Sequence, residues 1–322
     1  MSKILVTGAA GFIGAYVSRA LAQRGDQVIA IDSFNDYYDP QLKRDRVAAL
    51  VAPLGVEVQQ LDVADAEAVD RLFAEHSPDR VVHLAAQAGV RYSLEAPRAY
   101  LRANVDGFLN VIEACRAHPV EHLAFASTSS IYGATTDIPY SESQKVSQPV
   151  SLYAATKGAN ELMAHAYAHL FGIPMTALRF FTVYGPWGRP DMAPLLFTRA
   201  GMAGQPIKVF NQGQMRRDFT HVEDISRGVL GALDHPPGPV QGAPLRVLNL
   251  GRGEPVDLLR FIELIEQALG KPIARTYTDM QPGDMVETYA DTTRAKELFG
   301  YAPQITIDDG VPPLVAWCRE YF

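Results

Sequence analysis

The first 180 residues alternate short apolar runs with longer stretches in which apolar positions recur at helical spacing. The apolar runs predict buried strands, and the helical periodicity between them predicts amphipathic helices. We expect strands at 4–7, 27–31, 56–62, 80–84, 122–127 and 175–179, and helices at 13–24, 66–75, 98–117 and 153–171. Buried strands that alternate with helices are typical of a parallel sheet with helices on both faces. Right-handed crossovers then give a doubly wound α/β fold of the Rossmann type.

The pattern changes after residue 180. Proline and glycine become frequent, and strands and helices no longer alternate regularly. A helix at 222–233 and a strand at 245–250 still have the character of the first half. We therefore expect a Rossmann domain made of 1–180 plus about 222–251. A smaller, discontinuous C-terminal domain is expected from about 181–221 plus 252–322.

Composition narrows the possible ligands. The chain has 322 residues, 48% of them hydrophobic, which is enough for a full core. Its formal net charge of −7 disfavours nucleic acid as a partner. A small anionic ligand would need a local cluster of arginine or backbone N–H groups.

Neither cysteine has metal-ligand spacing, and Cys115 lies in an apolar helical pattern typical of a buried thiol. We expect no metal site. No apolar run approaches the ~18 residues that span a bilayer, so no membrane association is expected. A reducing, cytoplasmic location fits this composition.

Three glycines, Gly8, Gly11 and Gly14, follow the first predicted strand and open the first predicted helix. The first permits a tight turn, the second lets the backbone approach a pyrophosphate, and the third lets helix and strand pack closely. The helix N-terminus adds N–H donors and a favourable dipole. Glycines alone are a weak signal, but their place between strand and helix predicts a dinucleotide-binding loop.

Asp32, at the end of the second predicted strand, indicates which dinucleotide binds. A carboxylate there accepts hydrogen bonds from both ribose hydroxyls and repels a 2′-phosphate, which favours NAD over NADP. Residues at the ends of the third and fourth strands complete the expected site. The predicted cofactor-binding residues are Gly8, Gly11, Phe12, Ile13, Gly14, Asp32, Asn35, Lys43, Asp62, Val63, Leu84, Ala85, Ala86, Tyr153 and Lys157.

Tyr153 and Lys157 lie one helical turn apart at the start of a long predicted helix, so they share a face. An ammonium group beside a phenol favours the phenolate and lowers the pKa of the tyrosine toward the working pH of a base. Thr128 stands at the carboxyl end of the fifth predicted strand, where doubly wound sheets bind ligands. Its hydroxyl can relay the proton, so we predict Thr128, Tyr153 and Lys157 as catalytic residues.

The glycine loop, Asp32 and the Tyr153/Lys157 pair resemble the extended short-chain dehydrogenase/reductase superfamily, over essentially the whole chain. Three stretches narrow the resemblance to UDP-glucuronate 4-epimerases: 36–43 (DYYDPQLK), 151–157 (SLYAATK) and 179–192 (RFFTVYGPWGRPDM). The third stretch is the most specific. The resemblance implies an NAD-dependent isomerase that interconverts UDP-glucuronate and UDP-galacturonate.

The resemblance also implies a mechanism. Tyr153 removes the proton of the 4-hydroxyl, with Thr128 in the relay, and the hydride at C4 moves to NAD. The transient 4-keto sugar turns over while the nucleotide stays anchored. The hydride then returns to the opposite face, and NAD is regenerated in each cycle.

Because the chain is acidic overall, binding an anionic UDP-sugar would require a local group of cationic side chains. Arginine makes bidentate contacts to phosphate that lysine cannot match. The resemblance places Arg217 on the pyrophosphate and Asp284 on a uridine ribose hydroxyl, whereas Arg216 is expected to be a solvated charge. Arg189, Arg91 and the hydroxyls of Ser129 and Ser130 are candidates for the sugar carboxylate. The predicted substrate-binding residues are Arg91, Ser129, Ser130, Thr182, Arg189, Arg217 and Asp284.

Other nucleotide-sugar enzymes of this superfamily begin with the same oxidation at C4. A 4,6-dehydratase typically has Asp-Glu after the threonine, and a UDP-glucuronate decarboxylase usually has Glu where Ser130 stands, so Ser129 and Ser130 argue against both. A UDP-glucose/UDP-galactose 4-epimerase remains the alternative. A non-catalytic NAD-sensing protein is disfavoured by the intact Thr128, Tyr153 and Lys157. The resemblance further suggests a homodimer joined through the two long helices.

Overall fold

The structure is a computed structural model that describes residues 1–238, 242–280 and 285–322. Its strands are β1 (Lys3–Thr7), β2 (Gln27–Asp32), β3 (Val58–Gln60), β4 (Arg80–His83), β5 (His122–Thr128), β6 (Met175–Phe180), β7 (Thr182–Tyr184), β8 (Ile207–Phe210), β9 (Arg216–His221), β10 (Leu245–Leu250), β11 (Pro255–Asp257), β12 (Arg275–Thr278) and β13 (Glu287–Thr288).

The α-helices are α1 (Phe12–Arg24), α2 (Pro40–Leu50), α3 (Ala66–His76), α4 (Tyr92–Glu95), α5 (Pro97–Tyr100), α6 (Gly107–Ala117), α7 (Leu152–Phe171), α8 (Ala193–Met202), α9 (Val222–Asp234), α10 (Leu258–Leu269), α11 (Thr293–Phe299) and α12 (Ile307–Tyr321). Short 3₁₀ turns lie at η1 (Ala52–Leu54), η3 (Ser129–Tyr132) and η4 (Asn211–Gly213), and a π-helical stretch lies at η2 (Leu101–Asp106).

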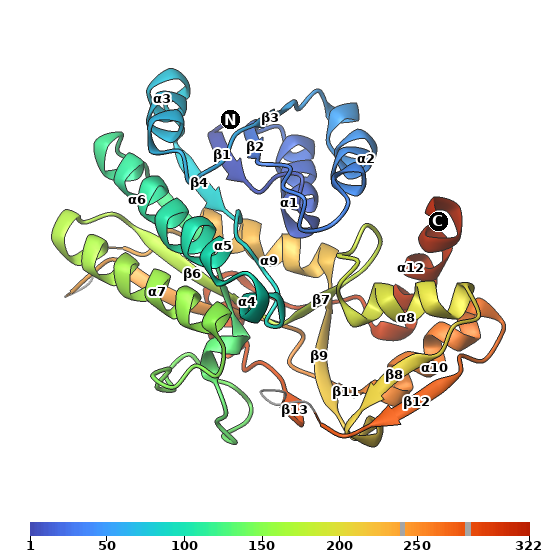
Figure 1. Ribbon diagram of the computed structural model, residues 1–322. Helices are drawn as coiled ribbons and strands as arrows, with labels where there is room; N and C mark the ends of the chain where they lie inside the picture. Colours follow the sequence, from blue (N-terminus) through green and yellow to red (C-terminus); the bar gives the residue numbers. More distant parts are fainter. Residues whose placement is uncertain (239–241, 281–284) are drawn as a thin grey trace.

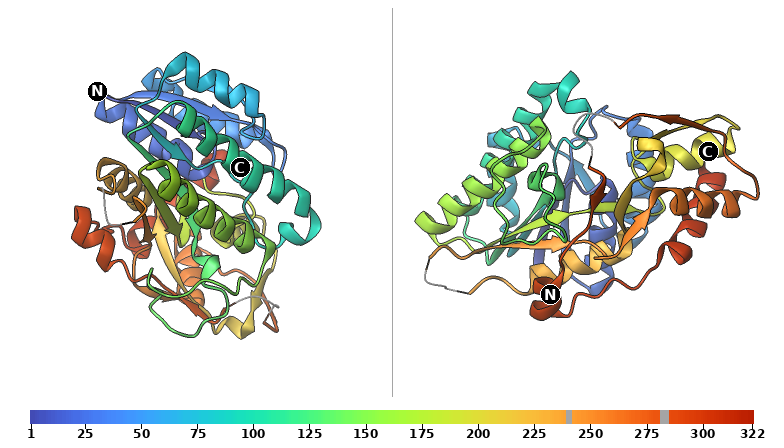
Figure 2. Two further views of the ribbon diagram at one scale, coloured as in Figure 1. Left: turned by 90° about the vertical axis from the view of Figure 1, so that its left-hand side faces the viewer. Right: turned by 90° about the horizontal axis from the view of Figure 1, so that it is seen from below.

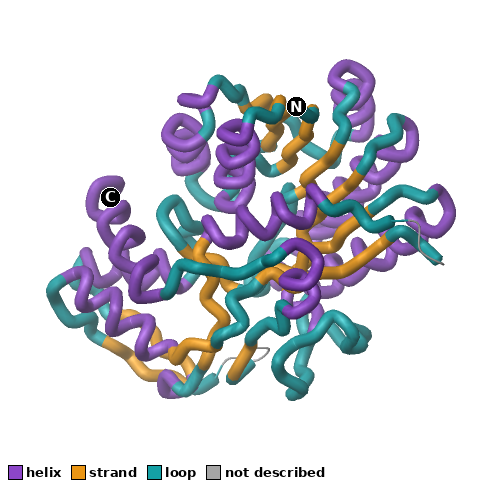
Figure 3. Tube along the Cα trace, turned by 180° about the vertical axis from the view of Figure 1, so that it is seen from behind, coloured by secondary structure: helices purple, strands orange, loops and turns teal. Residues whose placement is uncertain are grey.

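A seven-stranded sheet forms the centre of the molecule, in the order β10-β6-β5-β4-β1-β2-β3. Every pairing along it is parallel, as crossover helices require. The strands form one layer with helices on either side (Figure 3). The predicted doubly wound α/β fold is confirmed.

The two faces of the sheet bury separate apolar cores because successive side chains of a strand point to opposite sides. In β1, Ile4 and Val6 pack with residues of α1 and α9, whereas Leu5 packs with residues of α3, α6 and α7. Figure 1 shows α6 and α7 side by side on their face of the sheet. The strand order places β1 and β4 at the middle, where the direction of winding reverses.

Smaller sheets belong to the second half of the chain. β9 pairs with β7, β11 and β13, and β8 pairs with β12. A third apolar core joins α8, α10 and α12 to β8 and β9, with the Phe219 and Phe261 rings stacked at 4.2 Å. In Figure 1 these elements lie at the lower right, and the view from below in Figure 2 separates them from the green helices.

Three details differ from the sequence expectations. The chain forms α2, which the hydrophobic pattern did not predict, although Asp39 caps it and Pro40 opens it. The single helix predicted at 98–117 is instead α5, η2 and α6 in succession. The strand predicted at 56–62 is only β3, because this edge strand pairs on one side and leaves Gln59 and Gln60 exposed. Among the described residues, none of the helices combines the length and apolar character needed to cross a bilayer.

Candidate active site

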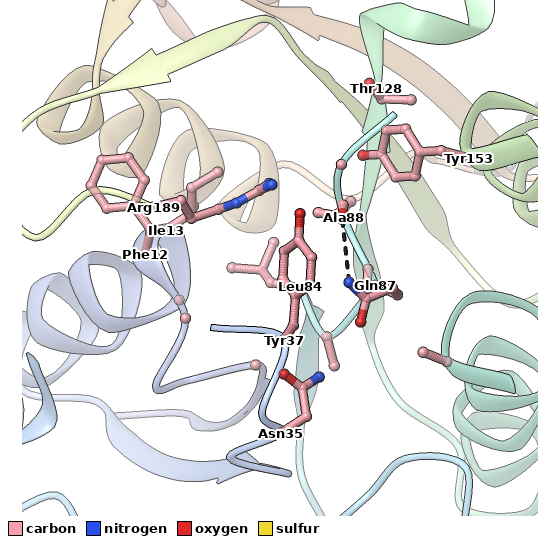
Figure 4. Close-up of a pocket in the computed structure, with 18 of the residues that line it drawn as sticks. Phe12, Ile13, Asn35, Tyr37, Leu84, Gln87, Ala88, Thr128, Tyr153 and Arg189 are labelled. Atoms are coloured by element: carbon pink, nitrogen blue, oxygen red, sulfur yellow. Dashed lines mark hydrogen bonds between the residues drawn. The ribbon is translucent and has the colours of Figure 1, made fainter. Parts of the chain in front are cut away.

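A pocket of about 650 Å³ opens where the carboxyl ends of neighbouring strands meet. Gly8, Asp32, Leu84 and Thr128 line it, and each stands at or just after the end of β1, β2, β4 or β5. Open α/β sheets bind ligands at this edge. In Figure 4, Thr128 and Tyr153 lie close together at one end of the pocket, and Asn35 lies toward the other.

The glycine loop is shaped for close backbone approach. Gly8 has a φ of +71°, a conformation that L side chains rarely adopt. A Cβ on Gly14 would lie 2.0 Å from the carbonyl oxygen of Gly8, so only glycine lets α1 pack onto the turn. The N-terminus of α1 thus faces the pocket, where the glycines leave the backbone open beside Phe12 and Ile13, and this cradle fits a dinucleotide pyrophosphate.

Asp32 is buried and organises the loop beside it. One carboxylate oxygen accepts from the Ala10 N–H at 3.1 Å, and the other accepts from the Phe34 N–H at 2.8 Å. Lys43 reaches the same end of the pocket from α2 and donates to the carbonyl and side-chain oxygens of Asn35 at 2.8 and 2.7 Å. Burial lowers the pKa of Lys43, and the negative charge of Asp32 opposes this shift. The carboxylate, amide and ammonium together fit the adenosine ribose of NAD.

Tyr153 and Lys157 both line the pocket from the first turns of α7, whose N-terminus Ser151 caps through a bond from the Ala154 N–H at 3.1 Å. Burial raises the pKa of Tyr153, while a hydrogen bond with Thr128 and the positive charge of Arg189 lower it. Lys157 is almost fully buried, and burial lowers the pKa of its ammonium to about 8. The pair therefore lies in a site where small changes of nearby charge control protonation.

A buried ion pair lies behind this pair. Glu161 follows Lys157 by one turn of α7 and accepts two bonds from Arg179, at 3.0 and 2.7 Å. The hydroxyl of Ser127, the residue before Thr128, donates to the same carboxylate at 2.6 Å. The charge of Glu161 raises the pKa of Lys157 against the effect of burial. The network thus joins β5, β6 and α7 directly behind the catalytic candidates.

Arg189 reaches the pocket from the loop after β7 and is part of a cross-pocket network that the sequence did not predict. Its Nε donates to Asp191 at 3.0 Å, and the Tyr37 hydroxyl, from the loop after β2, donates to the same carboxylate at 3.0 Å. Burial, together with Asp191, raises the pKa of Tyr37 to about 12. Figure 4 shows the Arg189 and Tyr37 side chains approaching each other across the opening. Tyr37 and Asp191 lie in two of the stretches that carried the family resemblance, and this was the signal in the sequence that could have identified them.

Every residue of the predicted cofactor-binding set lines the pocket, as do Thr128, Ser129, Ser130, Thr182 and Arg189. Arg217 and Arg91 lie outside this lining. Arg217 donates to the carbonyl oxygens of Arg216 and Val286 at 2.9 and 3.1 Å, and the Arg91 guanidinium lies over the Phe210 ring at 5.1 Å. Arg216 is about half exposed and pairs with Glu287 at 2.9 Å. Asp284 lies outside the described residues.

The sequence matches a known family over most of its length. Residues 4–251 match the NAD dependent epimerase/dehydratase family. The chain therefore belongs to this family, which confirms the resemblance to the extended short-chain dehydrogenase/reductase superfamily and the prediction of an NAD-dependent enzyme.

Individual relatives narrow the likeness further. The chain is 45% identical to UDP-glucuronate 4-epimerase 3 of Arabidopsis thaliana, and the alignment covers 99% of this chain and 77% of that protein. The crystal structure of UDP-glucuronic acid 4-epimerase from Bacillus cereus, in complex with UDP-glucuronic acid and NAD, is similar with a TM-score of 0.91 and 32% identity, covering 99% and 100% of the two chains. The UDP-glucose 4-epimerase of Thermus thermophilus, in complex with NAD, is similar with a TM-score of 0.86 and 29% identity, covering 99% and 100%.

Proposed function

We propose that this protein is an NAD-dependent 4-epimerase that interconverts UDP-glucuronate and UDP-galacturonate. The observation that carries the proposal is the pocket itself. A tyrosine–lysine pair, a strand-end threonine and a glycine loop share it with Arg189 and two serines, the donors that an acidic sugar needs. The likeness to proteins named UDP-glucuronate 4-epimerase supports the acidic sugar over a neutral one.

The cofactor in this proposal is NAD, which when bound takes up the hydride from C4 of the sugar and gives it back. The glycine loop would hold its pyrophosphate, and Asp32 would accept hydrogen bonds from its ribose. Asn35 and Lys43 would border that ribose, Asp62 and Val63 would bracket the adenine, and the small residues 85–86 would leave room against the sheet edge.

Tyr153 is the proposed base at the 4-hydroxyl. The Thr128 hydroxyl, which lines the pocket beside Tyr153 and lowers the pKa of the phenol, would give the proton a route between substrate and tyrosine. Lys157, kept cationic by Glu161 against its burial, stabilises the phenolate electrostatically. These residues hold and move one proton at one oxygen, so they serve the oxidation and the reduction equally.

The acid group of the sugar needs its own contacts. Oxidation at C4 makes a β-keto acid, because the carboxylate is attached to C5, and such acids lose CO₂ when the breaking bond aligns with the carbonyl π system. We propose that Arg189, with Ser129 and Ser130, holds the carboxylate so that this bond stays near the ketone plane. An ionic partner also keeps the carboxylate from being desolvated, which would favour its loss.

The nucleotide would be anchored outside the pocket described above. We propose Arg217 for the pyrophosphate, Thr182 for the sugar, and Arg91 as a second candidate for the acid group. Arg217 lies on β9, the strand at the centre of the smaller sheet, which gives it a rigid base. Asp284 remains the proposal for the uridine ribose. In this division the cofactor belongs to 1–180 plus about 222–251, and the UDP-sugar to about 181–221 plus 252–322.

We further propose a homodimer in the cytoplasm. Leu162 and Leu170 on α7 are 75% and 68% exposed, and Leu109 on α6 is 38% exposed, so these helices offer apolar side chains to a second copy. Both cysteines are buried and free, which fits a reducing compartment.

The test is a direct comparison of substrates. The purified protein is incubated with UDP-glucuronate and, separately, with UDP-glucose, and the rates are compared by chromatography. The proposal expects a kcat/KM for UDP-glucuronate that exceeds that for UDP-glucose. Interconversion of UDP-glucose and UDP-galactose without turnover of UDP-glucuronate would make the alternative epimerase the function instead.

A further inference from the structure

Arg46 on α2 is a charged side chain with no exposed surface, and it lies behind the pocket rather than in its lining. Its Nη1 donates to the carbonyl oxygen of Ala10 in the glycine loop at 2.6 Å. Its Nε and Nη2 both donate to the carbonyl oxygen of Trp187, at 3.0 and 2.7 Å. One guanidinium therefore joins the cofactor loop to the loop that carries Arg189.

The partners of this guanidinium are unusual for a buried charge. They are two backbone carbonyls and the Tyr38 hydroxyl at 3.2 Å, and within the described part of the chain no carboxylate is among them. Buried arginines are generally paired with an acid, because burying a charge is unfavourable. The planar fork of five N–H donors can bridge two separate backbone segments, which a lysine ammonium cannot do with the same geometry.

The bridged loop has a conformation that needs support. Trp187 has a φ of +63°, which is uncommon for a residue with a side chain. Its carbonyl is fixed by Arg46, and the carbonyl of Pro186 accepts from the Tyr16 hydroxyl of α1 at 3.1 Å. The Trp187 ring packs against Trp317 and Tyr321, with 5.1 Å between its centroid and each of theirs. Two residues further along, Arg189 turns into the pocket.

We propose that Arg46 is a positioning residue that sets the 185–191 loop, and through it Arg189, against the cofactor loop. The idea rests on the proposed function to the extent that Arg189 meets the sugar carboxylate. Without the two donors on its carbonyl, Trp187 loses the contact that holds its left-handed backbone, and Arg189 shifts relative to the glycine loop. Because the same guanidinium holds Ala10, the cofactor site and the acid-binding site keep one fixed spacing.

The first test follows the loop without any substrate. The sequence has two tryptophans, so Trp317→Phe leaves Trp187 as the sole emitter. In that background we expect Arg46→Met to shift the Trp187 emission to the red and to increase its quenching by acrylamide. Arg44→Met is the matched control, because it removes the same charge from an exposed position on the same helix. Equal emission and quenching in the Arg46→Met and Arg44→Met proteins would overturn the proposal.

The second test asks whether Arg46 acts through Arg189. At saturating NAD we expect Arg46→Met to lose about 10- to 100-fold in kcat/KM for UDP-glucuronate, the range of a misplaced binding group. The double variant with Arg189→Ala should then be no slower than Arg189→Ala alone, since both changes remove the same contact. Losses that multiply in the double variant, or normal kcat/KM in Arg46→Met, would contradict the route through Arg189.

These tests distinguish a failure of the proposed function from a failure of the proposed role of Arg46. If the wild-type protein does not turn over UDP-glucuronate, the proposed function fails, while the Trp187 emission still decides whether Arg46 holds the loop. If Arg46→Met is poorly folded, Arg46→Lys keeps the charge but not the fork. The lysine variant should show the same red shift and a smaller loss of kcat/KM. Unchanged Trp187 emission together with unchanged kcat/KM in Arg46→Lys would overturn the proposal.

Discussion

Replacing Glu161 with glutamine should lower the rate of the reaction at alkaline pH and change it little at low pH. The carboxylate is one helical turn from Lys157 and raises the pKa of its ammonium, which burial has lowered to about 8. Glutamine keeps the size of the side chain and removes the charge. We therefore expect the pKa of Lys157 to fall further in Glu161→Gln.

The sign of the effect follows from the role of the ammonium. Catalysis needs the charged form, so activity is present below the pKa of Lys157 and is lost as the pH rises through it. At a pKa of about 8, half of the lysines are charged at pH 8. A fall of one pKa unit, equivalent to ~1.4 kcal/mol, would leave about one-tenth charged at pH 8 and nearly all charged at pH 6. The loss of rate should thus be about five-fold at pH 8 and small at pH 6.

The assay is kcat against pH for UDP-glucuronate, with the alkaline limb fitted as a property of the coupled Tyr153–Lys157 pair. Ser127→Ala is the control, because it removes the 2.6 Å bond to the same carboxylate but leaves the charge in place. Thermal unfolding is measured in parallel, since an unpaired Arg179 destabilises the fold by ~3–5 kcal/mol. An alkaline limb at the wild-type pH, or a loss of equal size at every pH, would show that the charge of Glu161 does not control the protonation of Lys157.

Three further changes test individual roles. Tyr153→Phe should lose turnover by several orders of magnitude yet retain NAD, because proton transfer alone contributes ~10²–10⁴-fold; near-normal turnover by the purified variant would remove the hydroxyl from the mechanism. Asp32→Ala should weaken NAD binding and relax discrimination against NADP, because the carboxylate repels a 2′-phosphate; an unchanged preference in a cofactor titration would contradict this. Arg189→Ala should lose UDP-glucuronate turnover and release about ten-fold more UDP-4-keto-pentose or UDP-pentose per UDP-galacturonate, since a charge-assisted bond contributes ~1.5–3 kcal/mol; chromatography showing full activity and no added decarboxylation would exclude Arg189 as the carboxylate partner.

The parts of the site that the sequence predicted are local patterns with fixed spacing. Gly8, Gly11 and Gly14 follow a strand directly, and Tyr153 and Lys157 share one turn of a helix, so a short window contains the whole signal. The parallel sheet was predictable for the same reason, because buried strands are recognisable one at a time. In each case the structure adds distances and partners that the local pattern does not contain, such as Arg46 on the carbonyl of Ala10 in the glycine loop.

The parts that were missed depend on contacts between distant segments. Tyr37 and Asp191 are 154 residues apart, and no periodicity links them. The helix α2 buries Leu42, Lys43 and Arg46, so two of its three inward residues are charged and the apolar stripe of an ordinary helix is absent. Lys43 lines the cofactor side of the pocket, and Arg46 binds the glycine loop behind it. The inward face of α2 is therefore charged because it serves the site, and so it lacks a hydrophobic pattern.

In the proposed reaction, one hydride leaves C4 of UDP-glucuronate and returns to the opposite face of the same carbon. UDP-glucuronate carrying deuterium at C4 is incubated with the protein and NAD in ordinary water, and the product is identified by NMR. We expect UDP-galacturonate with the deuterium retained at C4. Hydrogen from solvent at C4, a UDP-pentose as the main product, or no turnover of this substrate would contradict it.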